Sequence, residues 1–216
     1  MIPTQYLIEK VLAILNEPYH ENSITLLSED TRSLHDTILE LLPDAVLFVQ
    51  NNKVYGTLNP KVYNVPEGAI TDNGDGSGSV LLPSDFVNLL EMRLDGWERP
   101  CTVLAPSGSP IALAQGNIYT RGGCSKPVCV DAVNGAGARI VEYYSLPKGK
   151  NPVVKNFVYE ALYEPQAGLS CNDGNPLVCA VAYQCAGLLY NVFERANAAA
   201  SFMALALSMC KNGNKT

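Results

Sequence analysis

Histidine is nearly absent from this sequence, and its scarcity limits the chemistry that the chain can perform. Only two of the 216 residues are histidine, His20 and His35, and both lie in the N-terminal part. Histidine is the commonest general acid or base, so a His-based mechanism has little material. The sequence also lacks a nucleophile elbow, a metalloprotease helix motif and a phosphate loop with its lysine. We therefore expect no enzymatic activity and no cofactor.

An excess of positive charge is also missing. The chain has 15 Lys and Arg against 21 Asp and Glu, which gives a formal net charge of -6. This sign gives no general attraction to nucleic-acid phosphates or anionic lipids. A surface that lines a DNA passage remains compatible with it, because a tunnel through which DNA slides should not hold the phosphates.

A secretory signal is not expected at the N-terminus. The first residues, 1–6, carry no basic cluster, and Glu9 and Lys10 interrupt the apolar stretch that follows. We therefore expect the protein to be made and kept inside a cell, with its cysteines as free thiols. The seven cysteines are Cys101, Cys124, Cys129, Cys171, Cys179, Cys185 and Cys210.

Two stretches of the sequence resemble metal sites in part, and each lacks a required ligand. Cys124 and Cys129 are separated by four residues, but the second close pair typical of structural zinc is absent, and neither histidine supplies it. Residues 73–78 resemble the opening of a calcium loop, but Ser84 stands where the bidentate Glu should be. We expect no metal.

A charge-free run covers residues 174–193, which is long enough in principle to cross a bilayer. It contains Asn175, Pro176 and Gln184, and no cluster of Lys or Arg flanks it. A buried core helix is the better interpretation, and no membrane contact is expected.

Helical periodicity marks both ends of the chain. Apolar residues three and four apart predict a helix over 3–17 and a second over 29–50, capped by Ser28 and kinked or restarted at Pro43. After residue 173 the same pattern predicts an antiparallel hairpin of two helices within 176–211.

The helical period disappears between these ends, and turn residues separate short candidate strands. A strand running into a short helix is expected over 80–94, and a hairpin around residues 134–137. The other expected strands are 53–57, 61–65, 128–133, 139–144 and 157–163.

These patterns predict an α+β fold in which N- and C-terminal helices form an antiparallel helical bundle with an inserted β-rich lobe. The expected division places residues 1–50 and 172–216 in the bundle and residues 51–171 in the lobe.

The most distinctive stretch of the sequence is residues 82–100. Proline stiffens its entry, a phenylalanine anchors it, and the only tryptophan of the chain supplies a large amphipathic surface. Its motif residues are Leu82, Pro83, Asp85, Phe86, Arg93, Gly96, Trp97, Arg99 and Pro100. By themselves they predict a core anchor followed by a turn.

Together with two preceding helices and an Ala-rich C-terminal helix pair, this stretch resembles the head-to-tail connector, or adaptor, proteins of tailed bacteriophages. The resemblance implies a structural virion protein without chemistry, made in the cytoplasm of a bacterial host and located at the head-tail junction. It implies a ring of neighbouring copies, commonly twelve, that docks beneath the portal protein, joins a downstream tail protein and passes DNA without binding it specifically.

The polar C-terminal end is the predicted portal contact, because a polar tail after a helix is free to become ordered on binding. The residues concerned are Lys211, Asn212, Lys215 and Thr216.

Two alternatives stay open. A soluble module that binds protein or carbohydrate through a β lobe on a helical stalk predicts a groove lined by exposed aromatics such as Trp97, Tyr143 and Tyr144. An enzyme predicts a cleft in which two Asp or Glu have raised pKa values.

Overall fold

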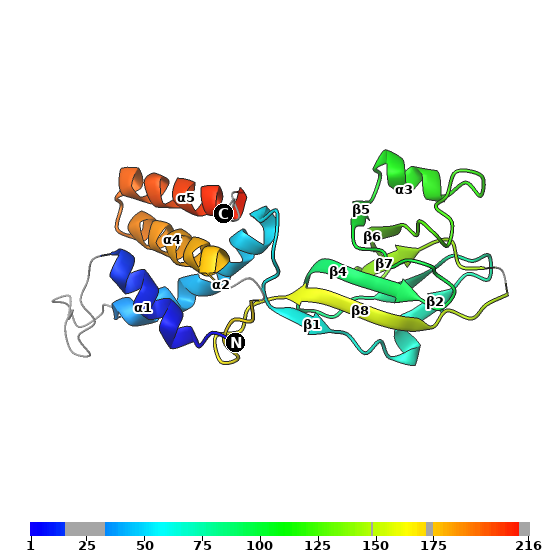
Figure 1. The fold of residues 1–216 in the computed structure, drawn as a ribbon, viewed down its shortest axis with the longest axis horizontal. Coiled ribbons are helices and arrows are strands. Elements are labelled where there is room, and N and C mark those ends of the chain that lie inside the picture. The colour runs from blue at the N-terminus through cyan, green and yellow to red at the C-terminus, as the bar shows by residue number, and fades with distance from the viewer. Residues whose placement is uncertain (16–32, 148, 172–174, 212–216) are drawn as a thin grey trace. The chain divides into compact units, whose positions relative to one another are not determined.

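The computed structural model describes residues 1–15, 33–147, 149–171 and 175–211, and within them the architecture is α+β, with helices near both ends of the chain (Figure 1). The helices are α1 (Thr4–Ile14), α2 (Leu34–Asn52), the 3-10 helix η1 (Glu67–Ala69), α3 (Pro110–Gln115), α4 (Asn175–Val192) and α5 (Ala196–Lys211). The strands are β1 (Pro60–Val62), β2 (Ile70–Asp72), β3 (Gly78–Leu81), β4 (Phe86–Leu94), β5 (Leu104–Pro106), β6 (Cys129–Val133), β7 (Arg139–Tyr143) and β8 (Val154–Ala161).

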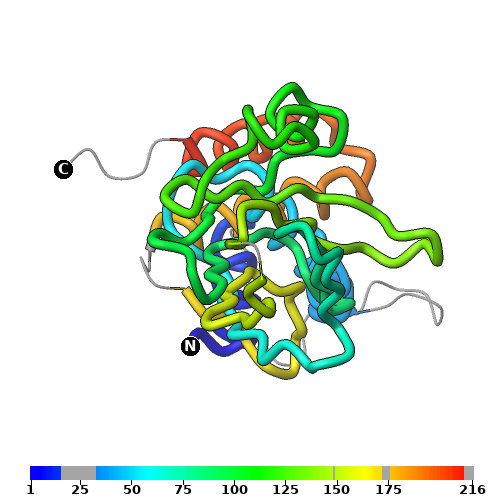
Figure 2. Tube along the Cα trace, turned by 90° about the vertical axis from the view of Figure 1, so that its right-hand side faces the viewer, coloured from blue at the N-terminus to red at the C-terminus, as the bar shows by residue number. Residues whose placement is uncertain are grey.

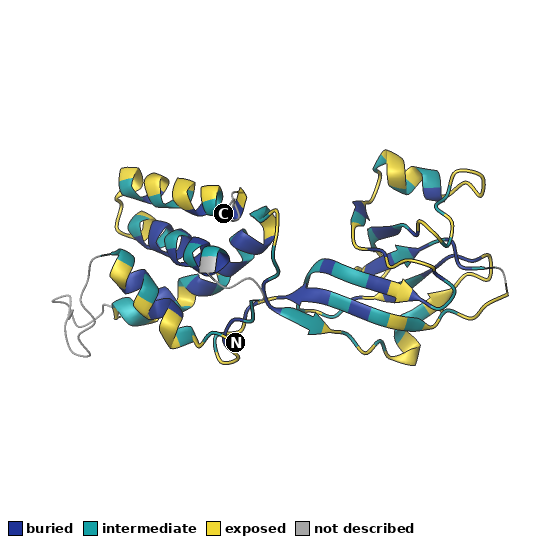
Figure 3. Ribbon diagram, viewed as in Figure 1, coloured by how far each residue is buried: buried dark blue, intermediate teal, exposed yellow. Residues whose placement is uncertain are grey.

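The chain divides into two compact units. Residues 1–60 and 161–216 form a helical unit, and residues 61–160 form a β-rich unit that includes α3. Each unit has its own buried apolar residues (Figure 3).

The first two helices of the helical unit form for the reasons that the sequence suggested. α1 buries Leu7, Ile8, Val11 and Leu12, which recur on one face. The expected cap at Ser28 lies outside the described residues. The hydroxyl of Ser33 instead caps α2 by accepting the Asp36 amide at 3.1 Å.

α2 continues through Pro43 without a break, so the expected restart after Leu42 does not occur. Buried side chains on both sides of the proline, Leu42 and Ala45, are fully enclosed in the core of the helical unit. Tertiary packing therefore holds the helix together where the local chemistry of proline opposes it.

α4 and α5 form the predicted hairpin, and they approach closely. A Cβ added at Gly187 of α4 would lie 2.8 Å from Cγ of Met203 and 3.2 Å from the Ala199 carbonyl oxygen of α5. α4 has a buried apolar face, as expected for a core helix. Among the described residues, no helix has both the length and the apolar character needed to span a membrane.

The strands of the β-rich unit form two sheets, one of three strands in the order β1-β8-β4 and one of five in the order β2-β3-β7-β6-β5. β6 and β7 form the predicted antiparallel hairpin, whose turn Figure 2 shows in lime green. The turn suits its sequence, because the Asn134 side-chain oxygen accepts the amides of Ala136 and Ala138, and Gly137 takes a φ of +81°.

Two of the strand predictions are wrong. Residues 53–57 are not a strand, because α2 extends to Asn52 and the following segment bends through Gly56 at a φ of +72°. Residues 86–94 form a continuous strand rather than a short helix. The buried residues Phe86, Leu89 and Met92 are three apart, a spacing that resembles a helix, but pairing of β4 with β8 decides the conformation.

The predicted fold class is also wrong in one respect: the β-rich part is not a lobe inserted in a helical bundle. Two sheets with eight strands build a sheet-rich core of their own, within the residues that the structure describes. Large side chains such as Met92, Leu94, Tyr143 and Phe157 are almost completely enclosed there. The sequence pattern could not reveal this core, since it depends on pairing between distant strands.

Two amides hold together the chain segments that flank the β-rich unit. Nε2 of buried Gln50 donates to the carbonyl oxygens of Leu58 and Ala161, at 3.2 and 2.9 Å. Nδ2 of Asn59 donates to the carbonyl oxygens of Ala161 and Leu162, at 3.2 and 2.8 Å. We call these hydrogen bonds the amide clamp.

Candidate functional site

The segment that opens the motif region, Leu82–Phe86, leads into β4 and is fixed by an ion pair. The Lys61 ammonium lies 2.7 Å from Oδ2 of Asp85, and the Tyr159 hydroxyl donates to Oδ1 at 2.9 Å. Burial raises the pKa of Asp85, but the two hydrogen bonds and the charge of Lys61 outweigh it and lower the pKa overall. Asp85 is therefore an ionised structural carboxylate.

Phe86 lies within an aromatic cluster. Its ring stacks on Tyr159 at a centroid distance of 5.6 Å and meets Phe157 edge to face at 6.3 Å. The guanidinium of Arg139 lies 5.0 Å from the Phe86 centroid, and the same side chain forms a bidentate pair with Asp131. Phe86 is thus the core anchor that the sequence predicted.

Gly96 and Trp97 form the turn that ends β4. Gly96 adopts a φ of +95°, which favours glycine, and the Trp97 amide donates to the Leu94 carbonyl at 3.1 Å. The Trp97 ring is buried. The chain then returns to β4, where Met92 and Cys101 exchange two backbone hydrogen bonds of 2.8 Å.

Most motif residues are therefore structural. Leu82, Phe86, Gly96 and Trp97 fix the entry and exit of β4, and Pro83 is half-buried at the entry. Arg93, Arg99 and Pro100 are exposed.

A surface groove of about 420 Å³ follows the motif. It is lined by residues 99–106, Ile111 and residues 125–128, and we call it the Arg99 groove. Its walls are mostly apolar, and the exposed Arg99 and Lys126 add two positive charges. Among the described residues, neither cation has an ion pair with an acidic side chain.

In α3, which contributes Ile111 to this groove, the usual burial pattern is reversed: apolar side chains are exposed and a polar one is buried. Its apolar residues Ile111 and Leu113 are 59% and 71% exposed, and its only buried residue is the polar Gln115. The Gln115 side chain donates to the Ile111 carbonyl and accepts the Gly122 amide at 3.0 Å, so it ties the following loop to the helix. Figure 3 shows most of α3 as exposed. Further exposed apolar residues lie before and after α3 in the chain; we call the set the α3 patch, which comprises Val103, Ile111, Leu113, Ile118 and Tyr119.

Sequence reasoning missed the α3 patch. A helix of six residues is too short to show a helical period. Ser109 before Pro110 is nevertheless a recognisable N-cap, and the Ser109 hydroxyl accepts a hydrogen bond from the Ala112 amide at 3.2 Å. The exposed positions could not be told from core positions by residue type.

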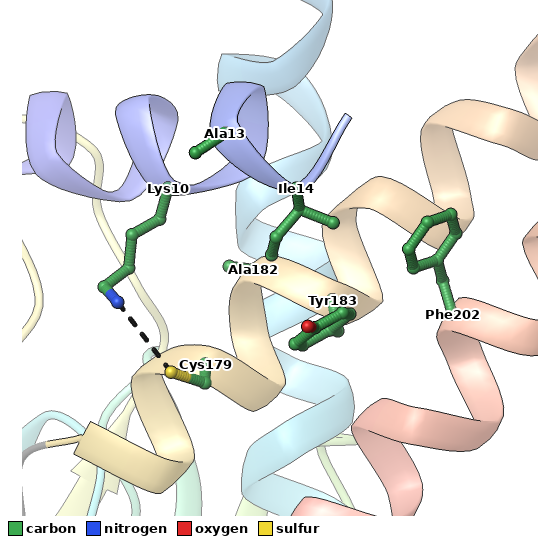
Figure 4. Close-up of a pocket in the computed structure, with 7 residues that line it drawn as sticks. All are labelled: Lys10, Ala13, Ile14, Cys179, Ala182, Tyr183 and Phe202. Carbon is green, nitrogen blue, oxygen red and sulfur yellow. Dashed lines mark hydrogen bonds between the residues drawn. The ribbon is translucent and has the colours of Figure 1, made fainter. Parts of the chain in front are cut away.

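A second hollow, of about 450 Å³, lies in the helical unit (Figure 4). Lys10 of α1 points across it toward Cys179 of α4, with 3.8 Å between Nζ and Sγ, and Tyr183 and Phe202 form an aromatic side. Among the described residues, the rest of the lining is apolar and includes no carboxylate or histidine. The described lining could enclose a small apolar group, but it supplies no acid–base pair for catalysis.

The binding-module alternative requires exposed aromatic side chains, and the enzyme alternative requires Asp or Glu with raised pKa values. Trp97 and Tyr143 are buried and cannot line a groove, and the half-buried Tyr144 donates to Glu142 at 2.8 Å. Asp75, held by hydrogen bonds from Ser77, also has a lowered pKa, as does Asp95 beside Lys155 and Lys150. Within the described ranges, no three His, Cys, Asp or Glu are grouped as metal ligands.

Of the predicted portal-contact residues, Lys211 is exposed at the end of α5. Asn212, Lys215 and Thr216 lie outside the described residues.

No protein-family model matches the chain, and no curated protein sequence matches it.

Proposed function

We propose that this chain is a structural subunit of the head-to-tail connector of a tailed phage, which joins its neighbours in a ring beneath the portal protein and around the DNA channel. One observation supports the proposal above the others: α3 presents its apolar side chains to solvent and buries its glutamine. Soluble monomers rarely leave such a patch uncovered, whereas subunits of an assembly use it as contact surface.

The neighbouring copy is the proposed occupant of the α3 patch. The Arg99 groove adds two cations to the patch, while the chain as a whole carries a net charge of -6. A positive, apolar acceptor on an acidic subunit suits contact with another copy of the same subunit. Contact between two different faces of identical subunits closes into a ring when the rotation permits.

The mass of the assembly in solution tests the proposal. Light scattering would be recorded for the chain alone and mixed with a purified portal protein. A ring or a portal-bound complex is the expected result. A chain that remains monomeric in both samples would contradict the proposal.

A substitution in α3 tests the contact surface. Leu113→Asp should weaken assembly at least about tenfold, because a charge would have to be buried at the contact. Val153→Asp is the matched control, since Val153 is also exposed in the same unit, but directly precedes β8 and is not part of the α3 patch. Equal assembly of both variants would show that the α3 patch is not the contact.

The C-terminal residues 211–216 remain the proposed portal contact. Deleting them should abolish portal attachment while leaving contacts between copies intact. Unchanged attachment in a pull-down with the portal protein would remove this part of the proposal.

A further inference from the structure

The thiols of Cys101 and Cys129 lie next to each other at the place where the two sheets of the β-rich unit meet. Cys101 pairs through its backbone with Met92 of β4, in the three-stranded sheet, while Cys129 begins β6 of the five-stranded sheet. The Cys129 thiol lies 3.8 Å from the Met92 sulfur, so both cysteines gather at Met92, and the Cys101 thiol donates to the Val103 carbonyl at 3.2 Å. Both are free thiols.

The two thiols differ in access and in acidity. Cys101 is 5% exposed and contributes to the wall of the Arg99 groove, whereas Cys129 is completely enclosed. The hydrogen bond from Cys129 lowers the pKa of Cys101 to about 6, although burial opposes this shift, and the same pairing raises the pKa of Cys129. A low-pKa thiol that borders solvent, beside a second thiol, is the usual arrangement of an oxidation-sensitive site.

We propose that Cys101 and Cys129 are a peroxide-sensitive dithiol that closes into a disulfide, with Cys101 as the attacking thiol and Cys129 as the resolving thiol. The Cys101 thiolate attacks one oxygen of hydrogen peroxide, and the O–O bond breaks. Cys101 becomes a sulfenic acid, and hydroxide leaves and takes a proton to form water. The Cys129 sulfur then attacks the Cys101 sulfur, the S–O bond breaks, and a second water leaves with the Cys129 proton.

The balance is two thiols and one peroxide to one disulfide and two waters. The sulfurs lose two electrons and the peroxide gains them, so no other reactant is needed. A peroxide is small enough to approach a thiol that is almost buried.

The disulfide would close a loop that contains β5, α3 and the segment 116–127. This loop carries the α3 patch, so oxidation would tie that surface covalently to β6. The dithiol rests on the placement of both cysteines beside Met92 and does not depend on the connector proposal.

Peptide mapping of the full chain after treatment with hydrogen peroxide tests the inference. A peptide pair joined through Cys101 and Cys129, with a mass lower by two hydrogens and reversed by dithiothreitol, is the expected product. Half-buried Arg121 lies inside the loop and is followed by glycine, so a tryptic cut there should leave fragments joined until reduction. Fragment spectra of the joined pair distinguish Cys129 from Cys124, which lies in the same tryptic peptide. A map in which both cysteines stay free, or pair elsewhere, would overturn the proposal.

Single substitutions separate the two roles. In Cys129→Ser the Cys101 thiol should proceed to sulfinic acid, whereas in Cys101→Ser the Cys129 thiol should remain unmodified. Cys185→Ser is the control, because Cys185 is buried and its pKa is raised to about 12, and the cross-link should form as in the parent chain. Oxidation of Cys129 at the parent rate in Cys101→Ser would refute the assignment of the attacking thiol.

Discussion

Gly96 shows at the residue scale how the end of β4 depends on one backbone conformation. A φ of +95° is strained for any residue with a side chain, and a Cβ there would lie 3.3 Å from Cδ of Pro147. Gly96→Ala should therefore lower the free energy of unfolding by about 1–3 kcal/mol. Denaturant titration of the full chain measures it.

Gly135 provides the control for this prediction. A Cβ at Gly135 meets nothing within 4 Å, and its φ is outside the strained range. Gly135→Ala should change the stability by no more than about 0.5 kcal/mol. Equal effects at both positions would mean that the turn tolerates a side chain.

Asp85 makes stability depend on pH. Its pKa in the folded chain lies below the ordinary value of 3.8, so the stabilisation is complete above that value and is lost as the pH falls through the folded-state pKa. Asp85→Asn should cost about 1 kcal/mol at pH 7, and this difference should shrink below pH 3.8. Asp95→Asn is the comparison, since its partners Lys150 and Lys155 are well exposed and the change should be smaller. A difference from Asp85→Asn that is constant across the acid range would contradict the assigned role.

The structural roles of some residues could be predicted from the sequence, and those of others could not. Phe86 could be predicted as a core anchor because it is a large aromatic residue. Gly96 and Trp97 could be predicted as a turn because glycine is typical of turns. The contact between Cys101 and Cys129 could not be predicted, because it depends on β5 lying beside β6 and on the return of the chain to β4. The sequence spacing groups Cys129 with Cys124 instead, whose thiol donates to the Ser145 carbonyl.

Pro43 lies inside helix α2, although proline disfavours the interior of a helix. It lacks the amide that would bond to the Leu39 carbonyl, yet α2 runs through it. Pro43→Ala should restore that hydrogen bond and raise the free energy of unfolding by about 1–3 kcal/mol. Thermal and denaturant unfolding of the full chain would measure the gain.

The neighbouring exposed residue Asp44 supplies the control for Pro43. Asp44→Ala also adds an alanine to α2, but should change the stability by no more than about 0.5 kcal/mol. A loss of stability in Pro43→Ala would show that the proline is needed for the path of the helix.

Among the elements, predictability followed length and locality. α1, α2, α4 and α5 were found because apolar residues repeat over eleven or more positions. α3 has six residues and its burial is inverted, so no period identifies it. The sequence predicts a short helix within β4, because its pairing partner β8 lies far along the chain and leaves no local signal.

On the scale of the whole molecule, the division into two units predicts that residues 60–161 fold on their own. The β-rich unit has its own core, and its first and last strands, β1 and β8, are neighbours in one sheet. The isolated fragment should unfold in one cooperative transition with the near-ultraviolet signal of a packed Trp97. A fragment without a cooperative transition would show that the helical unit is needed for folding.

The amide clamp determines how the molecule would carry tension. Since β1 and β8 are adjacent, tension that enters through the segments before Leu58 and after Leu162 could peel one strand from the other, one hydrogen bond after the next. Gln50 and Asn59 bind the two chain segments at Leu58, Ala161 and Leu162, ahead of those strands. The load reaches these buried hydrogen bonds first, so the strands remain paired until the clamp has yielded.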